Sequence, residues 1–132
     1  MGRRPKPTFD ESISPTDLPL RPSVRLRLAK SDTFFGPGVA EFLTLVDQTN
    51  SMQTACREME MSYSKGWKLI HTAEEETGWK IVERMSGGKN GGEAYITERG
   101  HMLLEKYELY RERVEAAAQD IYKDVFQDGE LF

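Results

Sequence analysis

The stretch SMQTACREMEMSYSKGWKLIHTAEEETG, residues 51–78, decides the fold. Its first half predicts a short helix that begins after Ser51, a common N-cap residue, and turns Cys56 inward. Its second half predicts a longer helix that begins near Ser62 and ends at Gly78, a residue type favoured just after helix ends. Two such helices joined by about three residues describe a helix-turn-helix.

The segments before this unit predict another helix and a basic strand. GPGVAEFLTLVDQTN (36–50) places a proline near a helix start, apolar residues on one helical face, and an asparagine suited to a left-handed end. SVRLRLAKS (23–31) alternates apolar residues with Arg25 and Arg27, which predicts a strand with a basic outer face. Residues 1–23 hold five of the six prolines and predict a flexible N-terminal arm.

A hairpin is expected after the helix-turn-helix. WKIVERM (79–85) and EAYIT (93–97) have the composition of strands, and a glycine-rich tip lies between them. The tip is not a P-loop, because Gly88-Lys89 is followed by an asparagine and then by a strand. Its glycines permit a tight turn and a close approach to another surface.

A long helix is expected at about 97–126, with Thr97 as its cap. Its apolar residues recur at close to heptad spacing, which favours self-association of a helix this long for so small a domain. The residues expected at a dimer interface are Leu103, Tyr107, Tyr110, Val114, Ala117, Ile121 and Val125.

The order of these elements predicts a mainly α protein with a small β-hairpin (α+β). The architecture expected is a winged helix-turn-helix over 24–132, with an N-terminal strand and a long C-terminal dimerisation helix. No linker or internal repeat divides the 132 residues into two domains.

Composition bounds the function. The net charge of −4 taken alone argues against nucleic acid, but residues 1–30 carry seven Lys/Arg against three Asp/Glu. Residues 93–132 carry five against ten, so the acid is concentrated at the C-terminal end. The chain has one cysteine and shows neither a secretory signal nor a membrane span, so a cytoplasmic location is expected. Association with a bacterial nucleoid is implied only by the family resemblance described next.

Residues 36–107 resemble the N-terminal DNA-binding domain of ModE-type molybdate-responsive transcription regulators, and more distantly the LysR-type helix-turn-helix. The motifs that carry the resemblance are GPG (36–38), MSYSKGWKLI (61–70), IVER (81–84), GGKNGGEAYIT (87–97) and TERG (97–100). The resemblance implies a homodimer whose helix 62–77 enters the major groove of duplex DNA. It does not extend to the family's C-terminal oxyanion-binding modules, so no molybdate site and no cofactor are expected in this chain.

The helix 62–77 begins with residue types that suit DNA contact. Hydroxyls and free N–H groups at a helix N-terminus bind phosphates, and lysines reach phosphates or guanine edges. In an isolated helix these would be ordinary surface residues; inside a helix-turn-helix the DNA interpretation is favoured. The residues expected to contact DNA, including those of the strand and the wing (86–92), are Ser62, Tyr63, Ser64, Lys65, Lys68, Arg84, Lys89, Arg25 and Arg27.

Two other functional classes were weighed against a DNA-binding regulator. A winged-helix adaptor that binds protein instead of DNA is motivated by the pI near 5.3. An enzyme is not expected, because Cys56, His71 and His101 form no recognisable acid–base pair. They also lack the spacing of a metal site. Trp67 is expected to be partly buried and structural.

Overall fold

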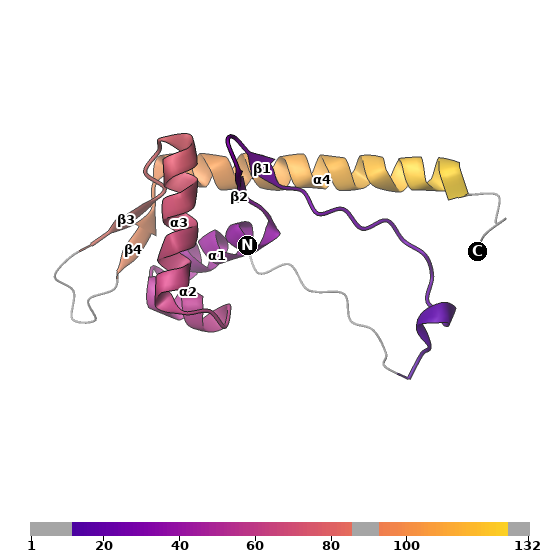
Figure 1. Ribbon diagram of the computed structural model, residues 1–132, viewed down its shortest axis with the longest axis horizontal. Coiled ribbons are helices and arrows are strands. Elements are labelled where there is room, and N and C mark those ends of the chain that lie inside the picture. The colour runs from indigo at the N-terminus through magenta and orange to yellow at the C-terminus, as the bar shows by residue number, and fades with distance from the viewer. Residues whose placement is uncertain (1–11, 86–92, 127–132) are drawn as a thin grey trace.

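The computed structural model describes residues 12–85 and 93–126 and is mainly helical, with two small antiparallel sheets (Figure 1). This confirms the predicted fold class. The helices are α1 (Pro37–Thr49), α2 (Met52–Glu58), α3 (Tyr63–Thr77) and α4 (Glu98–Phe126), and a short 3-10 helix, η1, spans Pro15–Asp17. The strands are β1 (Leu28–Ala29), β2 (Thr33–Phe35), β3 (Val82–Arg84) and β4 (Ala94–Ile96).

The helix boundaries follow from local capping. The hydroxyl of Ser51 accepts a hydrogen bond from the Thr54 N–H at 3.0 Å, and that of Ser62 accepts one from the Lys65 N–H at 3.1 Å. Gly78 ends α3 in the left-handed conformation, with φ of 75°. These caps are the ones that the sequence predicts.

The core lies where α1 meets α2, α3 and the hairpin. Phe42, Leu43 and Val46 of α1 are completely buried, which makes α1 the central helix. The other largest fully buried side chains are Phe35, Met52, Ile70, Ile81, Val82 and Tyr107. Burial of residues of this size provides most of the driving force for folding.

Helix α3 approaches α2 and α1 closely at Gly66. A Cβ on Gly66 would lie 2.4 Å from the Cys56 sulfur and 2.9 Å from Cζ of Phe42, both inside van der Waals contact. The absence of a side chain at Gly66 therefore sets the packing distance within the helix-turn-helix. Cys56 is buried and acts as a small core residue. Its burial raises the pKa of the thiol, which favours the protonated form.

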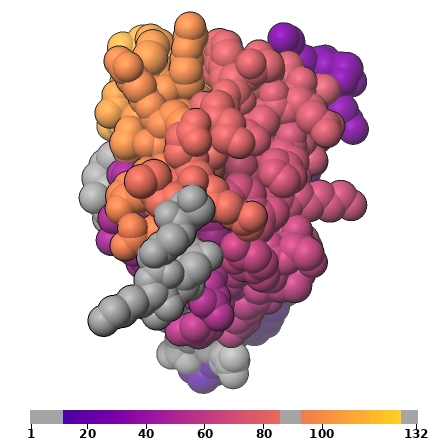
Figure 2. All heavy atoms as spheres, turned by 90° about the vertical axis from the view of Figure 1, so that its left-hand side faces the viewer, coloured from indigo at the N-terminus to yellow at the C-terminus, as the bar shows by residue number. Residues whose placement is uncertain are grey.

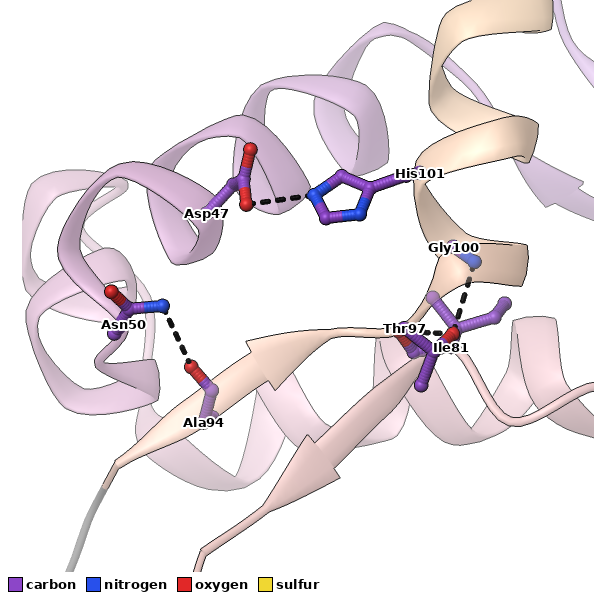
Figure 3. Close-up of polar contacts among 7 residues, drawn as sticks. All are labelled: Asp47, Asn50, Ile81, Ala94, Thr97, Gly100 and His101. Carbon is purple, nitrogen blue, oxygen red and sulfur yellow. Dashed lines mark hydrogen bonds and ion pairs between the residues drawn. The ribbon is translucent and has the colours of Figure 1, made fainter.

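The β3–β4 hairpin is attached to both α1 and α4 (Figure 3). The Ala94 N–H donates to the Asn50 carbonyl at 3.0 Å, at the end of α1. Thr97 caps α4, because its hydroxyl accepts from the Gly100 N–H at 3.0 Å and also donates to the Lys80 carbonyl at 2.6 Å. These bonds fix the orientation of the hairpin relative to α1 and α4; the tip predicted between its strands, 86–92, lies outside the described residues.

His101 also links the helices, since its Nε2 lies 2.9 Å from the carboxylate of Asp47 in α1 (Figure 3). The sequence offered no carboxylate partner for either histidine, so this pair is a finding of the structure. Both side chains are nearly half exposed. The pair is a surface contact between α1 and α4 and contributes little to stability.

The predicted N-terminal strand needs correction. Residues 24–27 are extended but have no strand partner, and the strand β1 covers only Leu28–Ala29. It pairs with β2, a strand that the sequence did not predict, because an extended segment becomes a strand only where a neighbour offers hydrogen bonds. Before β1 the chain follows α4 (Figure 1), and the Tyr107 hydroxyl donates to the Leu26 carbonyl at 2.9 Å.

Part of the predicted flexible arm also contacts α4. The Tyr122 hydroxyl donates to the Leu20 carbonyl at 3.0 Å, and η1 lies within the arm. Residues 1–11 lie outside the described part of the chain.

Glu76 near the end of α3 anchors the β1–β2 turn. Its carboxylate accepts hydrogen bonds from the Ser31 hydroxyl, at 2.6 and 2.9 Å, and from the Asp32 N–H at 2.7 Å. The bond from Ser31 is the main reason that the pKa of Glu76 is lowered from its ordinary 4.5. The small sheet is thus tied to α3.

We predict that Gly66→Ala lowers the free energy of unfolding by about 1–3 kcal/mol, because the new methyl group overpacks against Cys56 and Phe42. Adding Cys56→Ala removes the nearer contact. The double variant should therefore be more stable than the sum of the single effects predicts, by about 1 kcal/mol in urea unfolding.

The matched control is Gly38→Ala in α1. A Cβ on Gly38 meets no heavy atom within 4 Å, so this variant should be unchanged or stabilised by up to about 1 kcal/mol. Equal destabilisation by the two glycine substitutions would contradict the packing argument.

Candidate nucleic-acid interface

The first half of α3 exposes every residue that the sequence assigned to it for DNA contact. Ser62, Tyr63, Ser64, Lys65 and Lys68 are all exposed. They fall on two sides of the helix: Tyr63 faces the hairpin, whereas Ser64, Lys65 and Lys68 line a groove beside β2. Figure 2 shows α3 beside the hairpin on one face of the molecule.

An aromatic cluster joins α3 to the hairpin. The Arg84 guanidinium donates a hydrogen bond to the Tyr63 hydroxyl at 3.0 Å and lies 4.5 Å from the centre of the Trp67 ring. The Tyr63 and Trp67 rings meet edge to face, with 6.4 Å between their centroids. The centroid of the His71 ring lies 5.5 Å from that of Trp67. Residues four apart share a helix face, which explains why 63, 67 and 71 form one row.

Arg84 therefore has a role that the sequence did not suggest. Its contact with the DNA backbone stays a prediction; within the chain its guanidinium contacts Tyr63 and Trp67. A cation over an aromatic face together with a hydrogen bond fixes β3 against α3. Trp67 is partly buried against the core, in the structural position expected for it.

Arg25 and Arg27 lie near the lysines of α3. Both arginines line the same groove as Lys65 and Lys68, although about forty residues separate the two pairs in the sequence. The structure thus gathers four predicted DNA-contact residues on one side of α3. Of the other two basic residues predicted to contact DNA, Arg84 lies against Tyr63 and Trp67, and Lys89 lies outside the described residues.

The acidic residues at the end of α3 are used within the fold. One carboxylate oxygen of Glu74 accepts from the Ile81 N–H at 2.8 Å and from the Val82 N–H at 3.3 Å. Glu76 holds the β1–β2 turn, as described above. These contacts direct two of the three successive acids to neighbouring backbone. At the exposed start of α3 the charged side chains are Lys65 and Lys68, so the charge there is positive.

The apolar stripe of α4 divides into a packed half and an exposed half. Tyr107, expected at a dimer interface, is buried within the single chain, and its ring centroid lies 4.9 Å from that of Phe35, so we assign it to the core. Leu103 also packs against the core. The exposed members are Tyr110, Ala117, Ile121 and Val125, with Val114 half-buried.

Three exposed large apolar residues of α4 were not assigned from the sequence: Met102, Leu109 and Phe126. Leu109 lies beside Tyr110, one position away from the heptad-like series. Leu109 and Phe126 widen the apolar surface of α4, whose later turns Figure 1 shows extending beyond α1–α3 and the two sheets, beside the N-terminal arm.

Among the described residues, no group of three or more His, Cys, Asp or Glu side chains is placed to hold a metal ion. Within the same ranges no helix is long and apolar enough to cross a membrane.

Comparison with known proteins gives the family context. No family model matches the chain. Over 91 residues, 69% of this chain, it is 30% identical to the transcriptional regulator ModE of Haemophilus influenzae. Over the same share it is 28% identical to the DNA-binding transcriptional dual regulator ModE of Escherichia coli K12.

The chain is homologous to ModE-type transcriptional regulators. It is also 28% identical over 80 residues to the molybdenum-pterin-binding protein MopB of Rhodobacter capsulatus. The chain spans about a third of the length of these curated relatives: 35%, 34% and 30% respectively. The resemblance found in the sequence is thereby confirmed, and the ModE relatives are named as transcriptional regulators.

We predict that Arg84→Gln loosens the hairpin from α3, because it removes the cation over Trp67 and weakens the bond to Tyr63. Amide exchange of Ala94–Ile96 should become several-fold faster, corresponding to about 1 kcal/mol of local stability. Lys80→Gln, an exposed change at the base of the same hairpin, is the control. Equal exchange in wild type and Arg84→Gln would contradict a positioning role for Arg84.

Proposed function

We propose that this chain binds duplex DNA as a homodimer and regulates transcription. The observation that carries the proposal is the exposed, basic first half of α3 within a helix-turn-helix homologous to ModE regulators. Lys65 and Lys68 lie three residues apart at the start of the second helix of the motif, which in such proteins occupies the major groove.

In the proposed complex, each part of the surface has a separate task. Ser62 and Ser64 bind phosphates at the N-terminal end of α3, while Lys65 and Lys68 reach phosphates or guanine edges. The tip of the wing, with Lys89, follows the neighbouring backbone. Arg84 orients the wing through Tyr63 and Trp67.

The proposed dimer uses the second half of α4 in each subunit. An exposed apolar surface running along a protruding helix is best covered by a second copy of that helix. The interface is expected to include Tyr110, Val114, Ala117, Ile121 and Val125, joined by Leu109 and Phe126.

The adaptor alternative is not favoured. It requires an apolar patch across the exposed start of α3, where the structure has serines and lysines around the single tyrosine.

The DNA proposal is tested by salt titration of binding to duplex DNA. We expect the affinity of the wild type to fall steeply with salt. Lys65→Gln/Lys68→Gln should weaken binding about tenfold or more and reduce the salt slope by about 2.

Lys106→Gln, an exposed change on α4, is the matched control and should leave DNA binding unchanged. Failure of the wild type to bind any duplex, or equal loss in the control, would refute the proposal.

The dimer is tested by sedimentation of Ile121→Glu/Val125→Glu. Two charges placed on side chains that are each 62% exposed in the single subunit should leave its fold intact and convert the dimer into a monomer. Glu105→Gln, on an exposed part of α4 nearer the domain body, should remain dimeric. A wild type that sediments as a monomer at all concentrations would contradict the assignment.

A further inference from the structure

A groove of about 890 Å³ lies between α3 and the β1–β2 sheet. Its lining includes Lys65 and Lys68 of α3 and Arg25 and Arg27 of the segment that precedes β1. Its volume lies in the range of about 300–1,000 Å³ that is usual for pockets that bind small molecules.

All the charged side chains that line the groove are positive. No carboxylate lines it, and in 12–85 and 93–126 no carboxylate forms an ion pair with any of these four cations. Four neighbouring positive charges without internal partners repel one another, and an anion placed between them relieves that repulsion.

The floor of the groove is apolar. Phe34 and Phe35 are buried beneath it, and Met59, Met61 and Leu69 form partly buried walls. Phosphates of a DNA backbone bind through charge and hydrogen bonds and need no apolar floor. Cations above an apolar floor instead match a molecule that has an anionic end and an apolar body.

The walls of the groove are held in place by the fold. Glu76 ties the β1–β2 turn to α3 through Ser31 and Asp32. The aliphatic stem of Arg27 lies against Gly36, where a Cβ would be only 3.3 Å from its Cγ. A site that is formed before binding spares the ligand the cost of ordering it.

We propose that this groove binds a small organic anion, with a carboxylate held by the cations that line it and an aromatic or aliphatic body on the floor. The regulatory consequence rests on the proposed DNA-binding function: Ser64, Lys65 and Lys68 serve both ligands, so the bound anion competes with DNA. The groove is then an effector site on the DNA-binding domain itself.

The test uses 1-naphthoate as the probe and protein labelled with ¹³C at its methionine methyl groups. Met59 and Met61 line the groove, whereas Met52 is buried elsewhere in the core and Met102 is exposed on α4. Saturable shifts of the Met59 and Met61 signals are expected, with Met102 unchanged. Single Met→Leu variants assign the signals.

The chemistry of the ligand is tested with two further probes. The neutral 1-naphthamide and inorganic sulfate each keep only one half of the proposed ligand, and both should bind at least about tenfold more weakly than 1-naphthoate. Arg27→Gln/Lys65→Gln should weaken 1-naphthoate about tenfold, and Lys106→Gln should not.

Several results would overturn the proposal. Shifts that do not saturate with 1-naphthoate would overturn it, and so would equal binding of 1-naphthamide and 1-naphthoate. Shifts that depend on protein concentration and not on probe concentration would show that the groove is an interface between copies of the chain. Shifts caused by duplex DNA but not by 1-naphthoate would assign it to the DNA backbone.

A DNA competition experiment separates this proposal from the DNA-binding proposal. Saturating 1-naphthoate should weaken duplex binding several-fold at constant ionic strength. Unchanged DNA affinity with a filled groove would overturn the effector role alone. If the protein bound no DNA, the proposed function would be refuted. The methyl shifts would still show whether the groove binds 1-naphthoate.

Discussion

The close approach of α3 to α2 and α1 at Gly66 is the constraint on which the other contacts depend. The Cys56 sulfur and the Phe42 ring occupy the space that a Cβ on residue 66 would need. The backbone of α3 at Gly66 therefore packs directly against the side chains of α2 and α1. This fixes α3 against the central helix α1. The turn between α2 and α3 and the exposure of the first half of α3 follow from that packing.

From this fixed position, α3 organises the two structures beside it. Tyr63 and Trp67 of α3 contact Arg84 and so orient the β3–β4 hairpin. Near the C-terminal end of α3, Glu74 accepts the backbone N–H groups that begin β3, and Glu76 holds the β1–β2 turn. The acids are thereby used inside the fold, and the basic residues at the start of α3 remain at the surface.

The sequence predicts the helices and the hairpin well because their signals are local. Apolar spacing identifies α1, α3 and α4, and Ser51, Ser62 and Gly78 mark helix ends within a few residues of the groups they cap. The bounds of β1 were mispredicted because β1 forms only where it pairs with β2. The turn between these strands is held by Glu76, which lies 45 residues after Ser31 in the sequence.

The same distinction applies to the candidate site. The exposure of the α3 residues follows from the helix-turn-helix pattern, which the sequence shows. The engagement of Arg84 with Tyr63, the burial of Tyr107 and the gathering of four cations around one groove depend on tertiary contacts. No spacing along the chain encodes these contacts, so the sequence suggested DNA contact for Arg84 and a dimer role for Tyr107.

Selection of bound sequences from a random duplex pool tests the central claim most directly. A homodimer that places one α3 in each of two successive major grooves should enrich an inverted repeat whose half-site centres are about 10 base pairs apart, or a multiple of that spacing. A pool that shows no enriched motif, or only an unrepeated one, would contradict a dimeric, sequence-specific DNA-binding protein.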